Sequence, residues 1–199
     1  MKKSSFIILA VVAAIILALT TNHRSFADKE PVGVDEISKD SLIKRGAYLV
    51  TAMLCDDCHS PKRIGPRGPE IIPELRLSGF TQTNKLPKVD ANEIQKGWTL
   101  FNEDFTSAVG PWGASFAGNL TSDATGIGNW TEAQFRNALR KGKYKGLDKA
   151  RDLLPPMPWP NIGQSSDADI KAIYTFLKST RPVKNVVPAP ISLAELAVK

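Results

Sequence analysis

The spacing of apolar and polar residues predicts three helices in this 199-residue chain. The first covers residues 40–54, capped by Ser38 or Asp40. Its apolar residues recur at helical spacing and are Leu42, Ile43, Tyr48, Leu49, Ala52 and Met53. Gly46 interrupts this helix, where glycine costs about 1 kcal/mol relative to alanine. We therefore expect another backbone to cross the helix close to Gly46.

The second helix is predicted to begin after Trp130. Thr131 is a natural cap, and Gln134 stands three residues later, as in a capping box. The apolar residues of this helix are Phe135, Ala138 and Leu139. Gly142 is expected to end it, because glycine adopts the left-handed conformation common at helix C-termini.

The third helix is predicted over residues 167–179, with Ser166 as its cap and Pro182 beyond its end. Its apolar residues are Ile170, Ile173, Tyr174 and Leu177. We expect the first and third helices to cross at Gly46 and to close the domain.

The N-terminal residues 1–27 have the layout of a secretory signal peptide. Lys2 and Lys3 precede an apolar run over residues 6–19, and small residues, including Ala27, precede Asp28. An apolar run of this length is short of the roughly 20 residues that cross a bilayer. We therefore predict cleavage near Ala27 and export to the periplasm or the outer face of the cytoplasmic membrane. The alternative is an uncleaved anchor, which would associate the protein with the membrane.

Removal of this segment changes the charge. The whole chain has 26 basic and 20 acidic residues, a net charge of +6. Cleavage removes Lys2, Lys3 and Arg24 but no acidic residue, which leaves 26 − 3 = 23 basic residues and a net charge of +3. The basic balance is therefore partly a property of the signal, and no nucleic-acid partner is expected. The rest of the chain, residues 28–199, is expected to form a single domain.

The two cysteines stand with a histidine at positions 55–59, in the order Cys-Asp-Asp-Cys-His. In a c-type haem site, two cysteines at this spacing form thioether bonds to the haem, and the following histidine binds the iron. Cys55, Cys58 and His59 are therefore the predicted attachment and ligand residues for one covalently bound haem c.

Other interpretations of this motif are a zinc site, a thiol redox pair and chance. A structural zinc site needs four ligands, and the chain after residue 27 has only Cys55, Cys58 and His59 of the usual cysteine and histidine ligands. A thioredoxin-like pair should follow a strand, whereas these cysteines follow a predicted helix. The surrounding pattern disfavours chance.

Methionine is the expected ligand on the other side of the iron. After cleavage no second histidine remains, so counting excludes two histidine ligands. Met53 lies two residues before Cys55 and is expected in the core. Met157 lies among Pro155, Pro156 and Pro158, which restrict the backbone of its loop. Met157 is therefore the predicted second axial ligand.

Residues 62–118 show no sustained period and are predicted to form a long, loop-rich insertion. Clusters of glycine and proline interrupt it at residues 65–69 and 110–113, and a weak pattern over residues 92–100 predicts a short helix. A loop of this length is unusual in a compact domain. We expect the apolar surface of a haem to support it.

Together these features resemble the class I c-type cytochromes, and more specifically the bacterial cytochrome c domains linked to dehydrogenases. The resemblance rests on residues 55–59, 119–131, 153–159 and 182–188, and it extends over residues 40–190. It implies an all-α cytochrome c fold around one haem, with Cys55, Cys58, His59 and Met157 in the family's positions. The chain departs from the family in two ways. Many relatives have two or three haem domains, whereas this chain has one haem motif. The insertion of residues 62–118 also exceeds the minimal family fold. Residues 182–199 are expected to form an extended tail.

The predicted function is electron transfer without catalysis, as a periplasmic carrier or the cytochrome subunit of an oxidoreductase. Its partners would be redox proteins. A basic cluster precedes the methionine loop and could steer an acidic partner, or it could simply be a solvated loop. It comprises Arg140, Lys141, Lys143, Lys145, Lys149 and Arg151. The alternative function is a haem enzyme or gas sensor in which Met157 leaves the iron.

Overall fold

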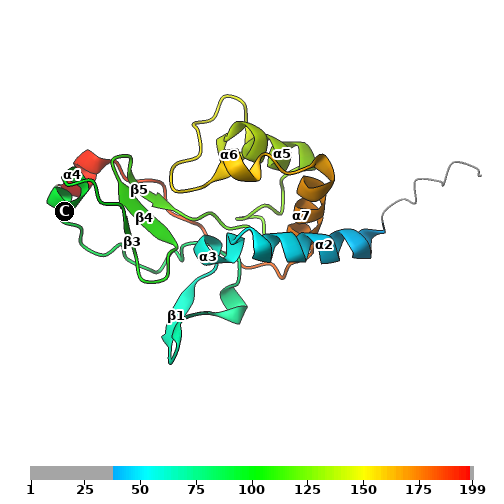
Figure 1. Ribbon diagram of the computed structural model, residues 1–199, viewed down its shortest axis with the longest axis horizontal. Helices are drawn as coiled ribbons and strands as arrows, with labels where there is room; N and C mark the ends of the chain where they lie inside the picture. Colours follow the sequence, from blue (N-terminus) through cyan, green and yellow to red (C-terminus); the bar gives the residue numbers. More distant parts are fainter. Residues whose placement is uncertain (1–37, 198–199) are drawn as a thin grey trace, which may run out of the picture. The chain divides into compact units, whose positions relative to one another are not determined.

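The computed structural model describes residues 38–197, and the predicted signal peptide lies outside them. The helices are α2 (Lys39–Ala52), α3 (Cys55–His59), α4 (Ala91–Gln95), α5 (Glu132–Lys141), α6 (Trp159–Ile162), α7 (Asp167–Ser179) and α8 (Leu193–Ala197) (Figure 1). The strands are β1 (Lys62–Gly65), β2 (Gly68–Ile71), β3 (Leu100–Phe101), β4 (Ser107–Gly110) and β5 (Gly113–Phe116). Short 3-10 turns lie at Pro73–Leu75 and Tyr144–Gly146.

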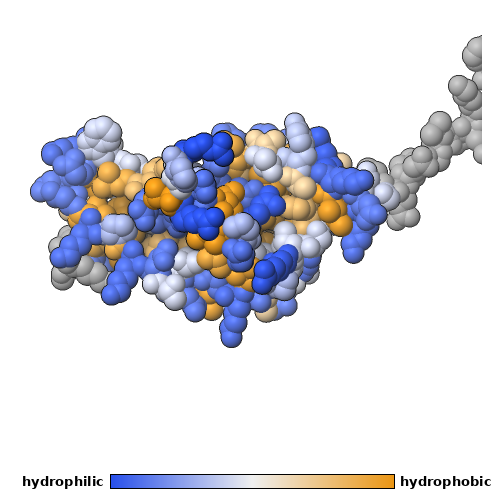
Figure 2. All heavy atoms as spheres, turned by 90° about the horizontal axis from the view of Figure 1, so that it is seen from below, coloured by the Kyte–Doolittle hydropathy of each residue, from blue (hydrophilic) through white to orange (hydrophobic). Residues whose placement is uncertain are grey.

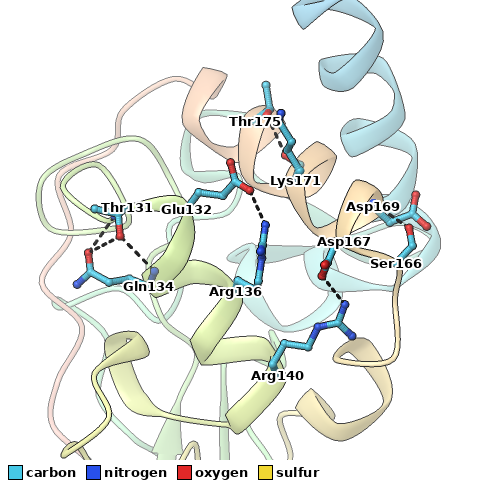
Figure 3. Close-up of polar contacts among 10 residues, drawn as sticks. All are labelled: Thr131, Glu132, Gln134, Arg136, Arg140, Ser166, Asp167, Asp169, Lys171 and Thr175. Atoms are coloured by element: carbon cyan, nitrogen blue, oxygen red, sulfur yellow. Dashed lines mark hydrogen bonds and ion pairs between the residues drawn. The ribbon is translucent and has the colours of Figure 1, made fainter. Parts of the chain in front are cut away.

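The three predicted helices are confirmed as α2, α5 and α7, and their caps follow from the sequence. The Ser38 hydroxyl accepts a hydrogen bond from the Ser41 backbone at 3.2 Å and caps α2. Thr131 and Gln134 form the predicted capping box of α5, and Ser166 caps α7 by accepting from the Asp169 backbone (Figure 3). Side-chain caps satisfy backbone N–H groups that have no partner within the helix.

The predicted crossing at Gly46 is confirmed. A Cβ atom built on Gly46 would lie 2.1 Å from the Ala172 carbonyl oxygen of α7, so only glycine fits at this contact. Arg45 adds an ion pair to Asp169, with 2.9 Å between Nε and Oδ1. The backbones of α2 and α7 therefore pack closely at Gly46, the residue of α2 with the lowest helix propensity.

The main core lies between these two helices, α5 and the loop that precedes α5. Its buried side chains are Leu49, Val50, Leu77, Ile127, Phe135, Leu139, Ile170, Ala172, Ile173 and Leu177. The apolar faces predicted for α2, α5 and α7 supply most of them. Half-buried residues pack against its edge, among them Cys55 and Met157.

The expectation of an all-α fold with an irregular insertion is wrong. Within residues 62–118, β1 and β2 form an antiparallel hairpin, and β3, β4 and β5 form an antiparallel sheet in that order. These strands have only two to four residues, and β4 is buried at every position. A strand buried on both sides has no alternation of apolar and polar residues, so periodicity does not reveal it.

The three-stranded sheet has a small core of its own. Ile94 of α4, Val109 of β4 and Ala114 of β5 are buried together. The C-terminal segment returns to this core, because Ile191 pairs with Ala114 and residues of α8 pack against it. The insertion and the tail therefore form one structural unit beside the main core.

In the described part of the chain, no helix combines the length and apolar character needed to cross a bilayer. Hydrophilic side chains are spread across the face shown in Figure 2, with smaller apolar areas between them.

Candidate functional site

The predicted haem motif lies on α3, a single helical turn that directly follows α2. Leu54 links the two helices in the left-handed conformation, with φ of 59°. Cys55 and Cys58 are free and partly exposed. Side chains three residues apart lie on the same side of a helix, so both sulfurs are available to one ligand.

The imidazole of His59 is oriented by a backbone carbonyl. Its Nδ1 lies 2.7 Å from the Gly118 carbonyl oxygen, and because a carbonyl only accepts, Nδ1 carries the proton. The other nitrogen, Nε2, therefore has a free lone pair. Burial lowers the pKa of His59, although the Gly118 hydrogen bond opposes this shift. A neutral imidazole held by a carbonyl is the usual form of a histidine metal ligand.

The two thiols do not resemble a redox-active pair. Burial, with a further contribution from the charge of Asp56, raises the pKa of Cys55 to about 11. Burial also raises the pKa of Cys58. Reactive thiols in disulfide exchange have lowered pKa values, because the thiolate is the nucleophile. The environment of α3 therefore disfavours the thiol-redox interpretation.

A zinc site also finds no support in the described part of the chain. Nowhere in residues 38–197 do three or more His, Cys, Asp or Glu side chains gather in an arrangement that could hold a metal ion.

Asp56, between the two cysteines, fixes α3 to the rest of the protein. Arg76 donates to its carboxylate twice, from Nε at 2.9 Å and from Nη2 at 2.7 Å. Ser60 donates a third hydrogen bond at 2.7 Å. Burial raises the pKa of Asp56, but these hydrogen bonds outweigh it, and the pKa lies below its usual value. The ionised carboxylate therefore anchors the turn that carries the cysteines.

Met157 belongs to the loop of residues 154–158, which we call the methionine loop. Its sulfur-bearing side chain is half-buried and packs against the main core, as Cys55 does. Leu153 begins the approach to the loop by donating to the Gly142 carbonyl at 2.6 Å, and α6 follows it. The indole of Trp159 lies against Gly142. The structure thus places Cys55, Cys58 and His59 on one turn, and Met157 at the edge of the same core.

Sequence reasoning did not identify Gly118, Ser115 or Arg76 as residues of this site. Arg76 contacts Asp56 across 20 residues, Gly118 contacts His59 across 59 residues, and Ser115 contacts Pro155 of the methionine loop across 40 residues. No local pattern marks such partners, because they are brought there by the fold of the insertion.

The residues present fit a covalently attached haem. Two free thiols lie one helical turn apart, beside a neutral imidazole whose Nε2 is available. Half-buried apolar side chains at the edge of the main core offer a surface for a flat apolar ligand; they include Met53, Leu120, Trp130, Met157 and Ile162.

Comparison with known proteins gives related cytochrome subunits. No protein-family model matches the chain. The gluconate 2-dehydrogenase cytochrome c subunit of Pantoea cypripedii is 30% identical over 185 residues, which cover 89% of this chain and 32% of the relative. The cytochrome c subunit of the quinone alcohol dehydrogenase of Gluconobacter oxydans is 29% identical over 153 residues, which cover 76% of this chain and 24% of the relative. The fructose dehydrogenase cytochrome subunit of Gluconobacter japonicus is 26% identical over 191 residues, which cover 92% of this chain and 31% of the relative. The chain thus spans about a third or less of the length of these curated relatives.

Proposed function

Because this chain is a c-type cytochrome similar to the cytochrome c subunits of bacterial dehydrogenases, we propose that it transfers electrons for an oxidoreductase, either as its subunit or as a separate carrier. The observation that carries this proposal is the turn of α3, where Cys55 and Cys58 lie beside an imidazole oriented by Gly118. A bound haem would supply an iron that accepts and releases single electrons.

Each residue of the site has a distinct task in this proposal. Cys55 and Cys58 hold the haem through thioether bonds, so that it stays attached after export. His59 supplies its Nε2 lone pair to one side of the iron. Met157 supplies its thioether sulfur to the other side, which favours the reduced iron and raises the reduction potential. With both sides filled, little rearrangement accompanies electron transfer, which suits a carrier more than a catalyst.

We further propose that the protein is exported and that it carries one haem, since the sequence has one Cys-x-x-Cys-His motif. Its partners would be redox proteins of the periplasm or of the outer face of the cytoplasmic membrane. The alternative, a haem enzyme or gas sensor, requires Met157 to leave the iron readily.

The absorption spectrum of the exported protein tests the proposal. After alkaline pyridine treatment, the absorption spectrum should be that of a haem whose two vinyl groups are saturated by thioethers. A colourless protein with two free thiols would overturn the proposal entirely. Cys55→Ala and Cys58→Ala should each remove one thioether bond and shift this spectrum.

The axial ligand is tested by substitution of each methionine. Met157→Ala should abolish the weak far-red band that a sulfur ligand gives with ferric iron, and Met53→Ala should retain it. Survival of the band in Met157→Ala would refute the assignment of Met157. Rapid, tight binding of carbon monoxide to the reduced wild-type protein at neutral pH would favour the enzyme or sensor.

A further inference from the structure

The end of β5 contacts both parts of the chain that carry the proposed axial ligands. The Ser115 hydroxyl donates to the Pro155 carbonyl oxygen at 2.7 Å, two residues before Met157. Three residues after Ser115, the Gly118 carbonyl accepts from Nδ1 of His59, also at 2.7 Å. Residues 115–118 therefore connect the histidine side of the site to the methionine side.

We propose that Ser115 is a positioning residue that holds the methionine loop in place and so keeps Met157 on the iron. This inference rests on the proposed function, because it takes Met157 as the axial ligand. It also gives the insertion a role, since the sheet of β3, β4 and β5 supplies the rigid support for Ser115.

The methionine loop has few other ways to be held. Pro155, Pro156 and Pro158 have no N–H group, so the loop can accept hydrogen bonds but can hardly donate them. The N–H of Met157 is already directed to the Leu154 carbonyl at 3.3 Å, within the loop itself. Among the described residues, Ser115 is the one side chain that donates a hydrogen bond to residues 154–157. Its hydroxyl is therefore the polar link between this part of the loop and the sheet.

Ser115 is itself firmly placed. Its residue is 9% exposed and pairs with Ala108 across β4 and β5. Nε1 of Trp112 donates to its hydroxyl oxygen at 3.2 Å, which occupies an acceptor position of the hydroxyl. The Ala108 carbonyl lies at 3.4 Å, farther away than Pro155, so the hydroxyl proton is directed chiefly to the methionine loop.

β5 is also fixed on its other side. Ala114 exchanges two backbone hydrogen bonds with Ile191, at 2.8 and 3.1 Å. The C-terminal segment thus pairs with β5 one residue before Ser115. A strand paired on both sides can move little, and it transmits this restraint to the loop that it holds.

The test compares haem-loaded Ser115→Ala with Ser107→Ala. Ser107 lies in β4 of the same sheet, is 2% exposed, and its hydroxyl has no hydrogen-bond partner among the described residues. The two variants therefore remove the same group from similarly buried strand positions, but only Ser115→Ala removes a link to the loop. We measure the far-red band of the ferric protein during titration with pH and denaturant, and carbon monoxide binding to the ferrous protein.

Ser115→Ala is expected to raise the population with detached methionine about fivefold, which corresponds to ~1 kcal/mol for one hydrogen bond. The far-red band should disappear under milder conditions and carbon monoxide should bind more readily, while Ser107→Ala resembles the wild type. Ser115→Thr retains the hydroxyl and should restore the wild-type behaviour. The inference is overturned if Ser115→Ala behaves as Ser107→Ala does, or if Ser115→Thr loses the band or the haem to the same extent as Ser115→Ala.

The wild-type protein separates the two proposals. A wild type without the far-red band refutes the methionine ligand and, with it, this inference. If the wild type has the band, and Ser115→Ala loses it under the same conditions as the wild type, then only the role of Ser115 is refuted and the methionine ligand stands.

Discussion

The ammonium group of Lys62 donates to the backbone carbonyl of Asp104 at 3.1 Å and joins the haem motif to the turn between β3 and β4. The same group donates to the carbonyls of Asp57 at 2.6 Å and Ser60 at 2.9 Å, at the end of α3. Carbonyl groups at the end of a helix have no partner within the helix. Lys62 therefore provides hydrogen-bond donors to the carbonyl groups at the end of α3, and the same ammonium group links α3 to the turn between β3 and β4.

Replacement of Lys62 with methionine should destabilise the protein by about 2 kcal/mol, because hydrogen bonds from a charged group contribute more than neutral ones. Denaturant unfolding of the haem-loaded protein measures this loss. Arg63→Met is the matched control, since Arg63 is the exposed neighbour on β1. Equal stability of the two variants would show that Lys62 does not anchor α3.

The three long helices could be predicted from the sequence because each signal is local. Apolar residues recur every three or four positions in each helix. Ser38, Thr131 and Ser166 each cap a helix by accepting a hydrogen bond from a backbone N–H three residues later. The closeness of α2 and α7 also followed from one residue, Gly46. A glycine in a helix is costly, so its presence points to a contact that excludes any side chain.

The sheet and the supports of the site could not be predicted in the same way. β4 and β5 have four residues each, and the Gly-Pro-Trp-Gly sequence at residues 110–113, noted only as an interruption, is the turn of their hairpin. Ile191 joins β5 from 77 residues away, since 191 − 114 = 77. Ser115 reaches Pro155 across 40 residues. Such pairings depend on the complete fold, and no periodicity within a short window encodes them.

Gly46→Ala should lower the thermal stability of the protein. The added Cβ would lie 2.1 Å from the Ala172 carbonyl oxygen, so α2 and α7 must separate. Overpacking of this kind typically costs 1–3 kcal/mol, and the better helix propensity of alanine returns about 1 kcal/mol. We expect a net loss of up to about 2 kcal/mol, and a larger loss for Gly46→Val, whose side chain adds more atoms at the same contact. Lys44→Ala, at an exposed position of α2, should change stability by less than about 0.5 kcal/mol; an unchanged melting temperature in Gly46→Val would contradict the crossing.

Arg76→Met should destabilise the protein in a pH-dependent manner. In the wild type, the pKa of Asp56 lies below its usual value, so its ionised form stabilises the fold above about pH 4. This contribution is lost as the pH falls through the pKa of the folded protein. Without Arg76, the burial of Asp56 remains and favours the protonated acid. The variant should therefore be less stable by about 2 kcal/mol at pH 7, and the difference should shrink towards pH 3.

Melting temperatures between pH 7 and pH 3 test this expectation. Lys96→Met removes an exposed partner of Glu93 and serves as the control, because exposed ion pairs contribute little. A constant difference between Arg76→Met and the wild type at all these pH values would mean that Asp56 does not depend on Arg76 for its charge.

Acidic side chains neutralise part of the basic cluster that precedes the methionine loop. Arg140 pairs with Asp167 at 2.8 Å (Figure 3), and Lys141 and Lys143 pair with Asp148 and Asp152 at 3.0 and 2.7 Å. The guanidinium of Arg151 lies over the ring of Tyr144, 4.1 Å from its centroid. Within the described residues, Lys145 and Lys149 are in no ion pair. These two lysines are therefore the residues to test for electrostatic steering.

A double variant, Lys145→Ala with Lys149→Ala, should react more slowly with ferricyanide, an anionic oxidant of the reduced protein. The matched control is Lys44→Ala with Lys171→Ala, which removes the same charge from exposed positions on α2 and α7. Because electrostatic attraction acts mainly within a Debye length of about 10 Å at 0.1 M salt, only charges near the site of electron exit should matter. We expect about a twofold difference between the two variants at about 0.1 M ionic strength, which disappears as more salt is added. Equal rates for the two variants would mean that lysines 145 and 149 lie away from the exit, and the steering role of this loop would then be wrong.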